Sequence, residues 1–236
     1  VAVKVLRPGI ERRFWRDISD MYFAARLAES RSTDARRLRV VDVVQTLERS
    51  VKMEMDFRLE AAAASEFAEN VEKDPDFRIP TVDWDRTARE VLTTSWIDGI
   101  PLSDISKIRD SGLDLPELAK NLMQSFLRHA LRDGLFHADM HQGNLFVDNN
   151  GILVAVDFGI MGRLGPRERR FLAEILFGFI TRNYRRVAEV HFEAGYVPRT
   201  HQIDDFAQAV RAIGEPIHSR TADQISMASL LTLLFE

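Results

Sequence analysis

The chain has 236 residues, of which 45% are hydrophobic and 29% charged, and its formal net charge at pH 7 is -4. These values predict a globular protein with room for one large domain or two small ones, and they show no basic footprint for nucleic acid. The chain contains no cysteine, which excludes a disulfide framework and a thiolate metal site, and no apolar run approaches the roughly 18 residues that span a bilayer.

The first residues, 1–6, form an apolar segment that predicts a strand carrying Lys4. A strand that reads Val-Ala-Val-Lys is typical of sites in which the lysine binds the α- and β-phosphates of ATP. The alternative is an edge strand whose lysine faces solvent. Because the strand begins without a preceding loop or methionine, we expect the chain to be cut at its front.

Two long helices are predicted in the next part of the chain. Apolar residues at helical spacing indicate a helix over about 10–27, and the polar residues 30–37 indicate a loop. A second helix is expected over about 41–71. Its small, alanine-rich part at 61–64 would let another element approach closely.

The second helix carries the candidate partner of the lysine. Asp56 and Glu60 are four residues apart, so they would share one face of this helix. A kinase site needs a helix glutamate that holds the phosphate-binding lysine in place. We therefore assign Glu60 to Lys4, and the helices between them would be an insertion.

Residues 79–84 and 89–94 predict two more strands of a small sheet, and residues 95–101 predict a hinge between two lobes. The backbone of the hinge at Ser95 and Ile97 could bind the edge of an adenine ring. The alternative interpretation is a strand followed by a turn.

A short helix is expected within 102–114, and Pro116 marks the start of a longer one. Asp133-Gly134 would end that helix and lead the chain to His137.

Residues 137–144, which read His-Ala-Asp-Met-His-Gln-Gly-Asn, carry the strongest signal in the chain. A hairpin pattern over 146–156 would place Asn144 before its first strand and Asp157 after its second. Mg²⁺ prefers oxygen ligands and takes few protein carboxylates, so Asn144 and Asp157 are the candidate ligands. Asp139 would accept the proton of an attacking hydroxyl or orient an attacking water. Each part alone is a weak signal, because a turn carboxylate often only caps a backbone N–H.

The two histidines of this loop leave another interpretation open. His137, Asp139 and His141 alternate, and such a cluster could hold zinc or iron. We favour His137 as a structural histidine that braces the loop.

Mostly helical structure is expected after Gly159. Pro166 would begin one helix, and further helices are expected around 186–194, 203–213 and 222–235. The last of them would pack on its lobe or lie at a membrane interface, and it ends without a cap signal, as if truncated.

Taken together, the chain resembles the UbiB/ADCK group of atypical kinase-like proteins, which are associated with coenzyme Q (ubiquinone) biosynthesis. The resemblance covers essentially the whole chain. The segments that carry it are Val1-Ala2-Val3-Lys4, the long helical insert, Glu54-x-Asp56 with Glu60, the loop 137–144 and Asp157-Phe158-Gly159.

The resemblance implies an α+β, two-lobed protein kinase-like fold. Residues 1–97 would form part of an N-lobe with a small sheet and a helical insertion, and residues 98–236 a mostly helical C-lobe. It implies ATP and Mg²⁺ as cofactors, with the site residues assigned as above: Lys4 and Glu60 as an ion pair, Asp139 as the catalytic aspartate, Asn144 and Asp157 as metal ligands.

The family also implies a segment with a Lys-x-Gly-Gln motif, which Glu54 and Asp56 would face and which would cover the site of a protein substrate. That motif, an alanine-rich phosphate loop and a C-terminal hydrophobic segment are not in this sequence.

Three functions therefore remain open. The first is an ATP-dependent phosphotransferase or ATPase in ubiquinone biosynthesis, with isoprenoid quinone precursors and ubiquinone-biosynthesis enzymes as partners. Its full-length form would contact the cytoplasmic face of the bacterial inner membrane, while this fragment would be soluble. The second is a small-molecule kinase of the aminoglycoside or choline kinase type. The third is a module that binds nucleotide or an isoprenoid lipid without turnover.

Overall fold

The computed structural model describes residues 1–218, so the helix expected at 222–235 lies outside the described part. Contacts within the chain divide it into two compact units. The first holds Val1–His129 and Leu135–Gly162, and the second holds Ala130–Gly134 and, of the described residues, 163–218. The boundary between an N-lobe and a C-lobe, expected between residues 97 and 98, stays a prediction.

The first unit begins with a two-stranded antiparallel sheet of β1 (Ala2–Val5) and β3 (Val91–Thr94), in which Lys4 lies opposite Leu92. Both expected strands are thus confirmed. The prediction of a strand at 79–84 is wrong. Only Val82 forms a bridge, to Thr94, and the chain then turns through the 3-10 helix η1 (Trp84–Arg86).

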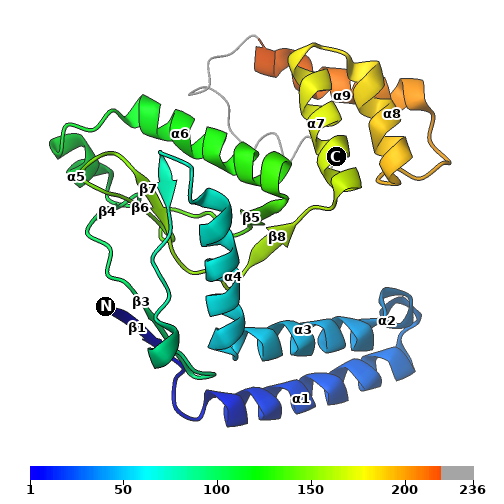
Figure 1. Ribbon diagram of the computed structural model, residues 1–236. Helices are drawn as coiled ribbons and strands as arrows, with labels where there is room; N and C mark the ends of the chain where they lie inside the picture. Colours follow the sequence, from blue (N-terminus) through cyan, green and yellow to red (C-terminus); the bar gives the residue numbers. More distant parts are fainter. Residues whose placement is uncertain (219–236) are drawn as a thin grey trace. The chain divides into compact units, whose positions relative to one another are not determined.

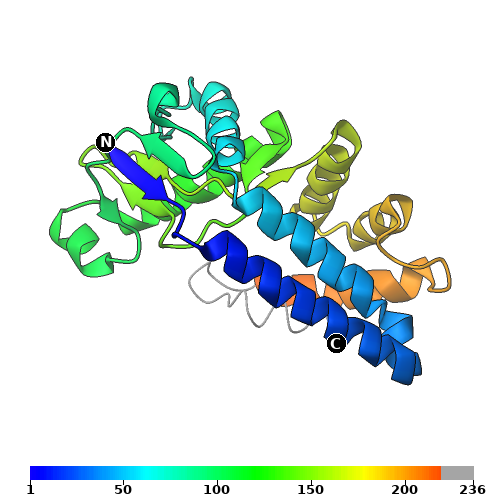
Figure 2. The same ribbon diagram turned by 90° about the horizontal axis from the view of Figure 1, so that it is seen from below.

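An antiparallel pair of helices follows β1, with α1 (Ile10–Arg31) and α3 (Val40–Glu54) side by side (Figures 1 and 2). The loop expected at 30–37 is wrong, because α2 (Thr33–Leu38) occupies most of it. Ser32 begins α2 by accepting a hydrogen bond from the N–H of Ala35, as N-cap serines do. The pair buries a small core of its own, made by Ile18, Ala25 and Val44.

The helix expected over 41–71 is interrupted. It ends at Glu54 and restarts as α4 (Phe57–Val71). Asp56 has an extended backbone and accepts a hydrogen bond from the N–H of Arg58 at 3.1 Å. Asp56 is therefore the N-cap of α4, and the expectation that it shares a helix face with Glu60 is wrong. Aspartate is favoured at the N-cap because its carboxylate accepts a hydrogen bond from a backbone N–H that has no partner within the helix.

A four-stranded sheet supports the metal-ligand hairpin. Its strand order is β2 (Phe77–Arg78), β7 (Leu153–Ala155), β6 (Leu145–Val147) and β4 (Ile100–Pro101). β6 and β7 form the expected antiparallel hairpin. The turn between them is held by Asp148, whose carboxylate accepts the N–H groups of Asn150 and Ile152, and Gly151 takes the positive φ of 79° that its place requires.

The helices α5 (Ile105–Asp110) and α6 (Leu115–Arg128) precede the functional loop, and Pro116 stands in the first turn of α6 as expected. A π-helical turn at His129–Asp133 follows α6. Strand β5 (Leu135–His137) then pairs with β8 (Met161–Arg163).

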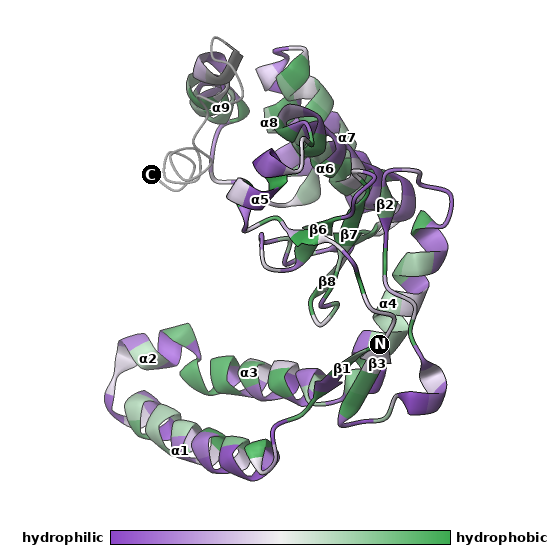
Figure 3. Ribbon diagram, turned by 90° about the vertical axis from the view of Figure 1, so that its left-hand side faces the viewer, coloured by the Kyte–Doolittle hydropathy of each residue, from purple (hydrophilic) through white to green (hydrophobic). Residues whose placement is uncertain are grey.

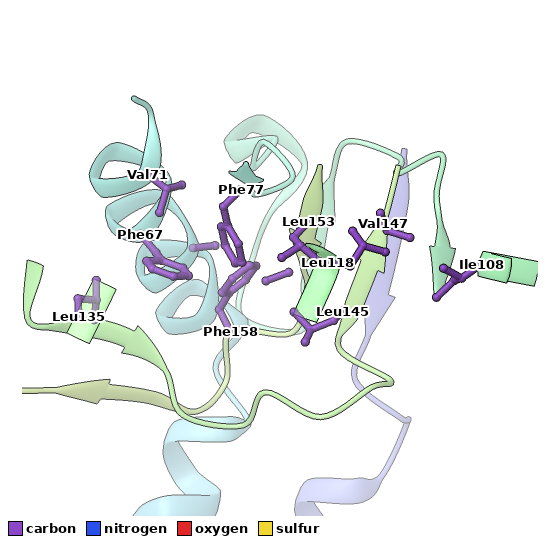
Figure 4. Packing of buried hydrophobic residues seen from close by; sticks show 12 residues of the cluster. Phe67, Val71, Phe77, Ile108, Leu118, Leu135, Leu145, Val147, Leu153 and Phe158 are labelled. Carbon is purple, nitrogen blue, oxygen red and sulfur yellow. The ribbon is translucent and has the colours of Figure 1, made fainter. Parts of the chain in front are cut away.

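The main core of the first unit lies between α4 and the four-stranded sheet (Figure 4). Phe67 from α4, Phe77 from β2 and Phe158 meet there, and all three are buried. Phe67 lies 5.9 Å from Phe77 and 6.1 Å from Phe158, measured between ring centroids. The phenylalanine of Asp-Phe-Gly is thus a core residue, which anchors the backbone beside Asp157.

The second unit packs α7 (Pro166–Ile180), α8 (Tyr184–Ala194) and α9 (Ile203–His218) around Tyr184, Val187 and Val210. Helices α7 and α8 approach closely at Gly178, where an added Cβ would lie 2.5 Å from Val187. Within the described residues, every helix is too short or too polar to span a bilayer. Figure 3 shows that even the longest, α1, alternates hydrophobic and hydrophilic residues.

Candidate active site

Three residues of the predicted nucleotide site meet at the ammonium group of Lys4. Lys4 Nζ lies 2.9 Å from both carboxylate oxygens of Glu60 and 3.0 Å from Oδ1 of Asp157. Its ammonium also lies 5.3 Å from the centroid of the Phe57 ring, within the range of a cation–π contact. A strand, a helix and a hairpin far apart in the sequence therefore meet here, all within the first unit.

These contacts change the proton affinities of all three groups. Burial would lower the pKa of Lys4, but the hydrogen bonds and charges of Glu60 and Asp157 outweigh burial and raise it. Burial would raise the pKa of Asp157, but the hydrogen bond and charge of Lys4 and the N–H of Gly159 lower it. For Glu60, burial raises the pKa in spite of Lys4. Lys4 is thus held as a cation and Asp157 as an anion, as phosphate and metal binding require.

Small side chains let α4 bring Glu60 to this point. Ala61 and Ala64 are buried, the first against Phe57 and Leu92 and the second in the main core. Alanine also favours the helix itself. The alanine-rich segment therefore serves the close approach that its composition suggested.

The hairpin brings Asn144 next to Asp157, as its pattern predicted. Asn144 precedes β6, and its main-chain oxygen accepts the N–H of Val156 at 2.9 Å, one residue before Asp157. Asn144 is 7% exposed. Its amide nitrogen donates to the main-chain oxygen of Asp139 at 3.1 Å, and no hydrogen bond among the described residues uses its side-chain oxygen.

Asp157 has a left-handed backbone, with φ of 63°. Among residues with a side chain, aspartate and asparagine tolerate this region best. The conformation turns the chain sharply between the buried strand and the buried Phe158 and leaves the carboxylate half-exposed. The ionised carboxylate of Asp157 and the uncommitted amide oxygen of Asn144 are oxygen donors of the kind that Mg²⁺ prefers.

His137 joins the functional loop to the hairpin. Its Nδ1 accepts the N–H of Asp139 at 3.1 Å, and its Nε2 lies 3.0 Å from the carbonyl oxygen of Val156. Because Nδ1 accepts, the proton is on Nε2, which donates to that carbonyl. The ring is 1% exposed. Both nitrogens are therefore occupied, and His137 cannot join Asp139 and His141 in a zinc or iron site. Residues 1–218 contain no other cluster of three histidine or carboxylate side chains suited to a metal.

A cleft of about 390 Å³ opens beside Lys4, Glu60 and Asp157. Ser95 and Ile97 of the expected hinge line it, and so does Thr94. The remaining wall is mostly apolar, with Ala64, Leu92, Pro101, Phe146, Val156 and Phe158. An apolar slot with charged groups at one end fits a flat base attached to phosphates.

Two backbone groups of the expected hinge, which could bind a base, form no hydrogen bonds with the rest of the described residues. The N–H of Ser95 donates to the oxygen of Thr81 at 2.8 Å, and the Ser95 hydroxyl accepts the N–H of Thr81 at 3.0 Å. The Ser95 carbonyl and the Ile97 N–H form no hydrogen bond among the described residues. An acceptor and a donor two residues apart match the N6 and N1 atoms of adenine.

The structure does not bring every expected residue to the cleft. Asp139 and Asn144 are not among the residues that line the cleft. Glu54 is exposed at the end of α3 and does not line it either. Asp56 is engaged by Arg58, whose guanidinium reaches both carboxylate oxygens, at 2.9 and 2.6 Å. The role of this pair in facing a covering segment stays a prediction.

Sequence reasoning assigned no role in catalysis to His141. In the structure its Nε2 lies 3.6 Å from Oδ2 of Asp139, and its Nδ1 accepts the N–H of Gly143 at 3.0 Å. The alternation of His137, Asp139 and His141 in the sequence brings His141 close to Asp139 along the chain, but by itself this pattern indicates only a possible metal site.

A lysine–glutamate pair next to an Asp-Phe-Gly hairpin and an Asp-x4-Asn loop defines a protein kinase-like fold. The sequence pattern of the ABC1 atypical kinase-like domain matches residues 1–191. The chain belongs to this family.

Curated relatives extend the match over the whole chain. The probable protein kinase UbiB of Azotobacter vinelandii is 40% identical over 240 residues, which covers 100% of this chain and 45% of that protein. The probable protein kinase UbiB of Marinobacter nauticus is 39% identical and is covered to 44%. The chain thus spans less than half the length of these relatives.

A solved structure shares the fold. In the complex of Rv3197 with erythromycin, from Mycobacterium tuberculosis, the protein superposes with a TM-score of 0.68 at 26% sequence identity. The superposition covers 95% of this chain and 59% of that one. The expected α+β kinase-like fold and the UbiB/ADCK resemblance are both confirmed.

Proposed function

We propose that the full-length protein binds Mg²⁺ and ATP in this cleft and acts as a phosphotransferase or ATPase. The observation that carries the proposal is the placement of Lys4 between Glu60 and Asp157 at the charged end of an apolar cleft. Glu60 would hold Lys4 toward the α- and β-phosphates, while the Ser95 carbonyl and the Ile97 N–H would bind adenine.

The chemistry assigned to the chain is general-base catalysis with electrostatic stabilisation. The oxygen of a hydroxyl group or of water attacks the γ-phosphorus, and the bond from that phosphorus to the β,γ-bridging oxygen breaks, which releases ADP. The proton of the attacking oxygen passes to the carboxylate of Asp139. Asn144 and Asp157 would hold Mg²⁺, which when bound would neutralise charge on the phosphates.

The site also bears on the other two candidate functions. The helical insert α1–α3 separates Lys4 from Glu60 by 56 positions, which argues against an ordinary small-molecule kinase. A module without turnover would not require Lys4, Asp139, Asn144 and Asp157 together.

We propose a role in ubiquinone biosynthesis because the curated relatives that match the whole chain carry the UbiB name. Isoprenoid quinone precursors and ubiquinone-biosynthesis enzymes would be the partners. The place of action would be the cytoplasmic face of a bacterial inner membrane.

Thermal shift measurements on the full-length protein test the nucleotide site. Mg²⁺ and ATP together should raise the melting temperature, and Asp157→Asn should abolish the shift while keeping the tolerated backbone conformation. Asp110→Asn, at the exposed end of α5, is the matched control and should retain it. A full shift in Asp157→Asn would contradict the assigned site.

A genetic test addresses the pathway. Deletion of the gene should lower cellular ubiquinone, and Asp139→Asn should fail to restore it where the wild type succeeds. Normal quinone in the deletion strain would contradict the pathway and leave the nucleotide site standing.

A further inference from the structure

The carboxylate of Asp139 is half-exposed, and only one of its oxygens lies near side-chain donors of the loop. Oδ2 lies 3.5 Å from the amide nitrogen of Asn144 and 3.6 Å from Nε2 of His141. No hydrogen bond among the described residues reaches Oδ1. One oxygen is thus turned toward two donors, which leaves the other for a substrate proton.

The orientation of the His141 ring is set by its neighbours, although the side chain is 59% exposed. The Gly143 N–H donates to Nδ1 at 3.0 Å. In a neutral imidazole whose Nδ1 accepts, the proton must be on Nε2, and Nε2 is the atom that faces Asp139. The backbone therefore selects the tautomer that presents a donor to the carboxylate.

The loop leaves space for this ring only because residue 143 is glycine. A Cβ at that position would lie 2.9 Å from Cε1 and 3.0 Å from Nδ1 of His141. The turn itself is closed by two backbone bonds, from the His141 N–H to the Asp139 oxygen and from the Asn144 N–H to the His141 oxygen. Imidazole, glycine and turn therefore form one unit around Asp139.

We propose that His141 is a positioning residue for Asp139: its Nε2–H, 3.6 Å from Oδ2, attracts that oxygen electrostatically, so that Oδ1 faces the attacking hydroxyl or water. The inference rests on the proposed function, because it gives Asp139 the role of proton acceptor. Asn144 is the other donor to Oδ2, and it is also assigned to the metal. His141 is the donor whose only assigned task is to orient the base. Correct orientation matters because small misplacement of a catalytic group has large effects on rate.

Steady-state ATP hydrolysis by the full-length protein tests this role. His141→Leu removes the donor and should lower kcat roughly tenfold to a hundredfold, as expected for a misplaced base. The KM for ATP should stay within about twofold and the Mg²⁺–ATP thermal shift should be retained, since His141 is not among the residues that line the cleft. His141→Gln, which places an amide donor at a similar reach, should recover most of the rate.

A second variant leaves the imidazole in the protein. Gly143→Ala should displace the ring and lower kcat in the same way, and combined with His141→Leu it should cost nothing further, since both remove one interaction. Unchanged kcat in His141→Leu, or additive losses in the double variant, would overturn the inference.

The binding measurement separates this inference from the function beneath it. If the wild type binds Mg²⁺–ATP and turns it over while His141→Leu matches it, only the positioning role is refuted. If the wild type shows no Mg²⁺–ATP shift, the proposed function and the positioning role are both refuted.

Discussion

Lys4 and Glu60 are 56 residues apart, yet the ammonium of one lies 2.9 Å from both carboxylate oxygens of the other. Glu60 is 8% exposed and Lys4 42%. The pair is thus buried on the glutamate side and open on the lysine side. A cation held in this way can meet a phosphate without leaving its partner.

Replacing Lys4 should destabilise the protein in a pH-dependent way. Lys4→Met leaves a buried carboxylate without its cation, which should cost about 1 kcal/mol after allowing for the exposure of Lys4. The pKa of Lys4 is raised above 10.5 in the folded protein, so its stabilising effect is complete below that pH and disappears as the pH rises through the raised value. Urea unfolding of both proteins should show a constant difference at neutral pH that closes in strong alkali.

Lys107→Met is the matched control, because Lys107 is 70% exposed and its one ion pair within residues 1–218 is with Asp104, three positions away. A difference for Lys4→Met that persisted unchanged in strong alkali would contradict the ion-pair explanation.

Asp76 should contribute to stability at neutral pH and lose that contribution in acid. Arg128 donates to both of its carboxylate oxygens, at 2.8 and 3.2 Å, and these bonds hold the pKa of Asp76 below 3.8. The stabilisation is therefore present above pH 3.8 and is lost as the pH falls through the lowered value. Asp76→Asn should cost about 2 kcal/mol near neutral pH. Urea titrations at several pH values would show the difference from wild type shrinking in acid, and the exposed Asp20→Asn should show none.

The hinge should bind nucleotide through its backbone. Ile97→Pro removes an N–H and should weaken Mg²⁺–ATP binding roughly tenfold, the value of one hydrogen bond. Ile97→Leu keeps the N–H and should bind as wild type, and Ser95→Ala should change affinity little. Calorimetric titration of the three variants makes the comparison. Equal affinities for Ile97→Pro and Ile97→Leu would show that the base lies elsewhere.

The cap of α4 should be worth about 1 kcal/mol. Asp56→Ala removes the bond to the Arg58 N–H and should lower the free energy of unfolding by that amount. Asp56→Asn keeps a capping oxygen and should lose much less. If both variants were equally destabilised, the charge contact with the Arg58 guanidinium, and not the cap, would be the stabilising interaction.

Local patterns predicted the hairpin that carries the candidate metal ligands better than they predicted the helices. The pattern predicts the hairpin because an Asn-Asn-Gly turn between short apolar runs has few alternatives, and the structure forms it, with the main chain of Asn144 bonded to Val156, one residue before Asp157. The break at Asp56 was missed, because the apolar spacing continues across it and only the cap chemistry marks it. The helix at 33–38 was missed because its six residues bury nothing.

Pairing between distant segments was the other limit. Strand β2 is two residues long and exists because it lies parallel to β7, with Phe77 opposite Leu153. No local periodicity can reveal such a strand. The contact between His141 and Asp139 depends on the space left at Gly143, which only coordinates reveal.

The interruption between α3 and α4 separates the helix that carries Glu60 from the helical insert. In a continuous helix from residue 40 to residue 71, the direction of the insert and the position of Glu60 would be rigidly coupled. Met55 and Asp56 interrupt the helix between α3 and α4. The N–H of Phe57, the first residue of α4, donates a hydrogen bond to the main-chain oxygen of Arg89. Helix α4, which carries the carboxylate that steadies Lys4, is therefore anchored at its own first residue by a bond to a segment outside the insert.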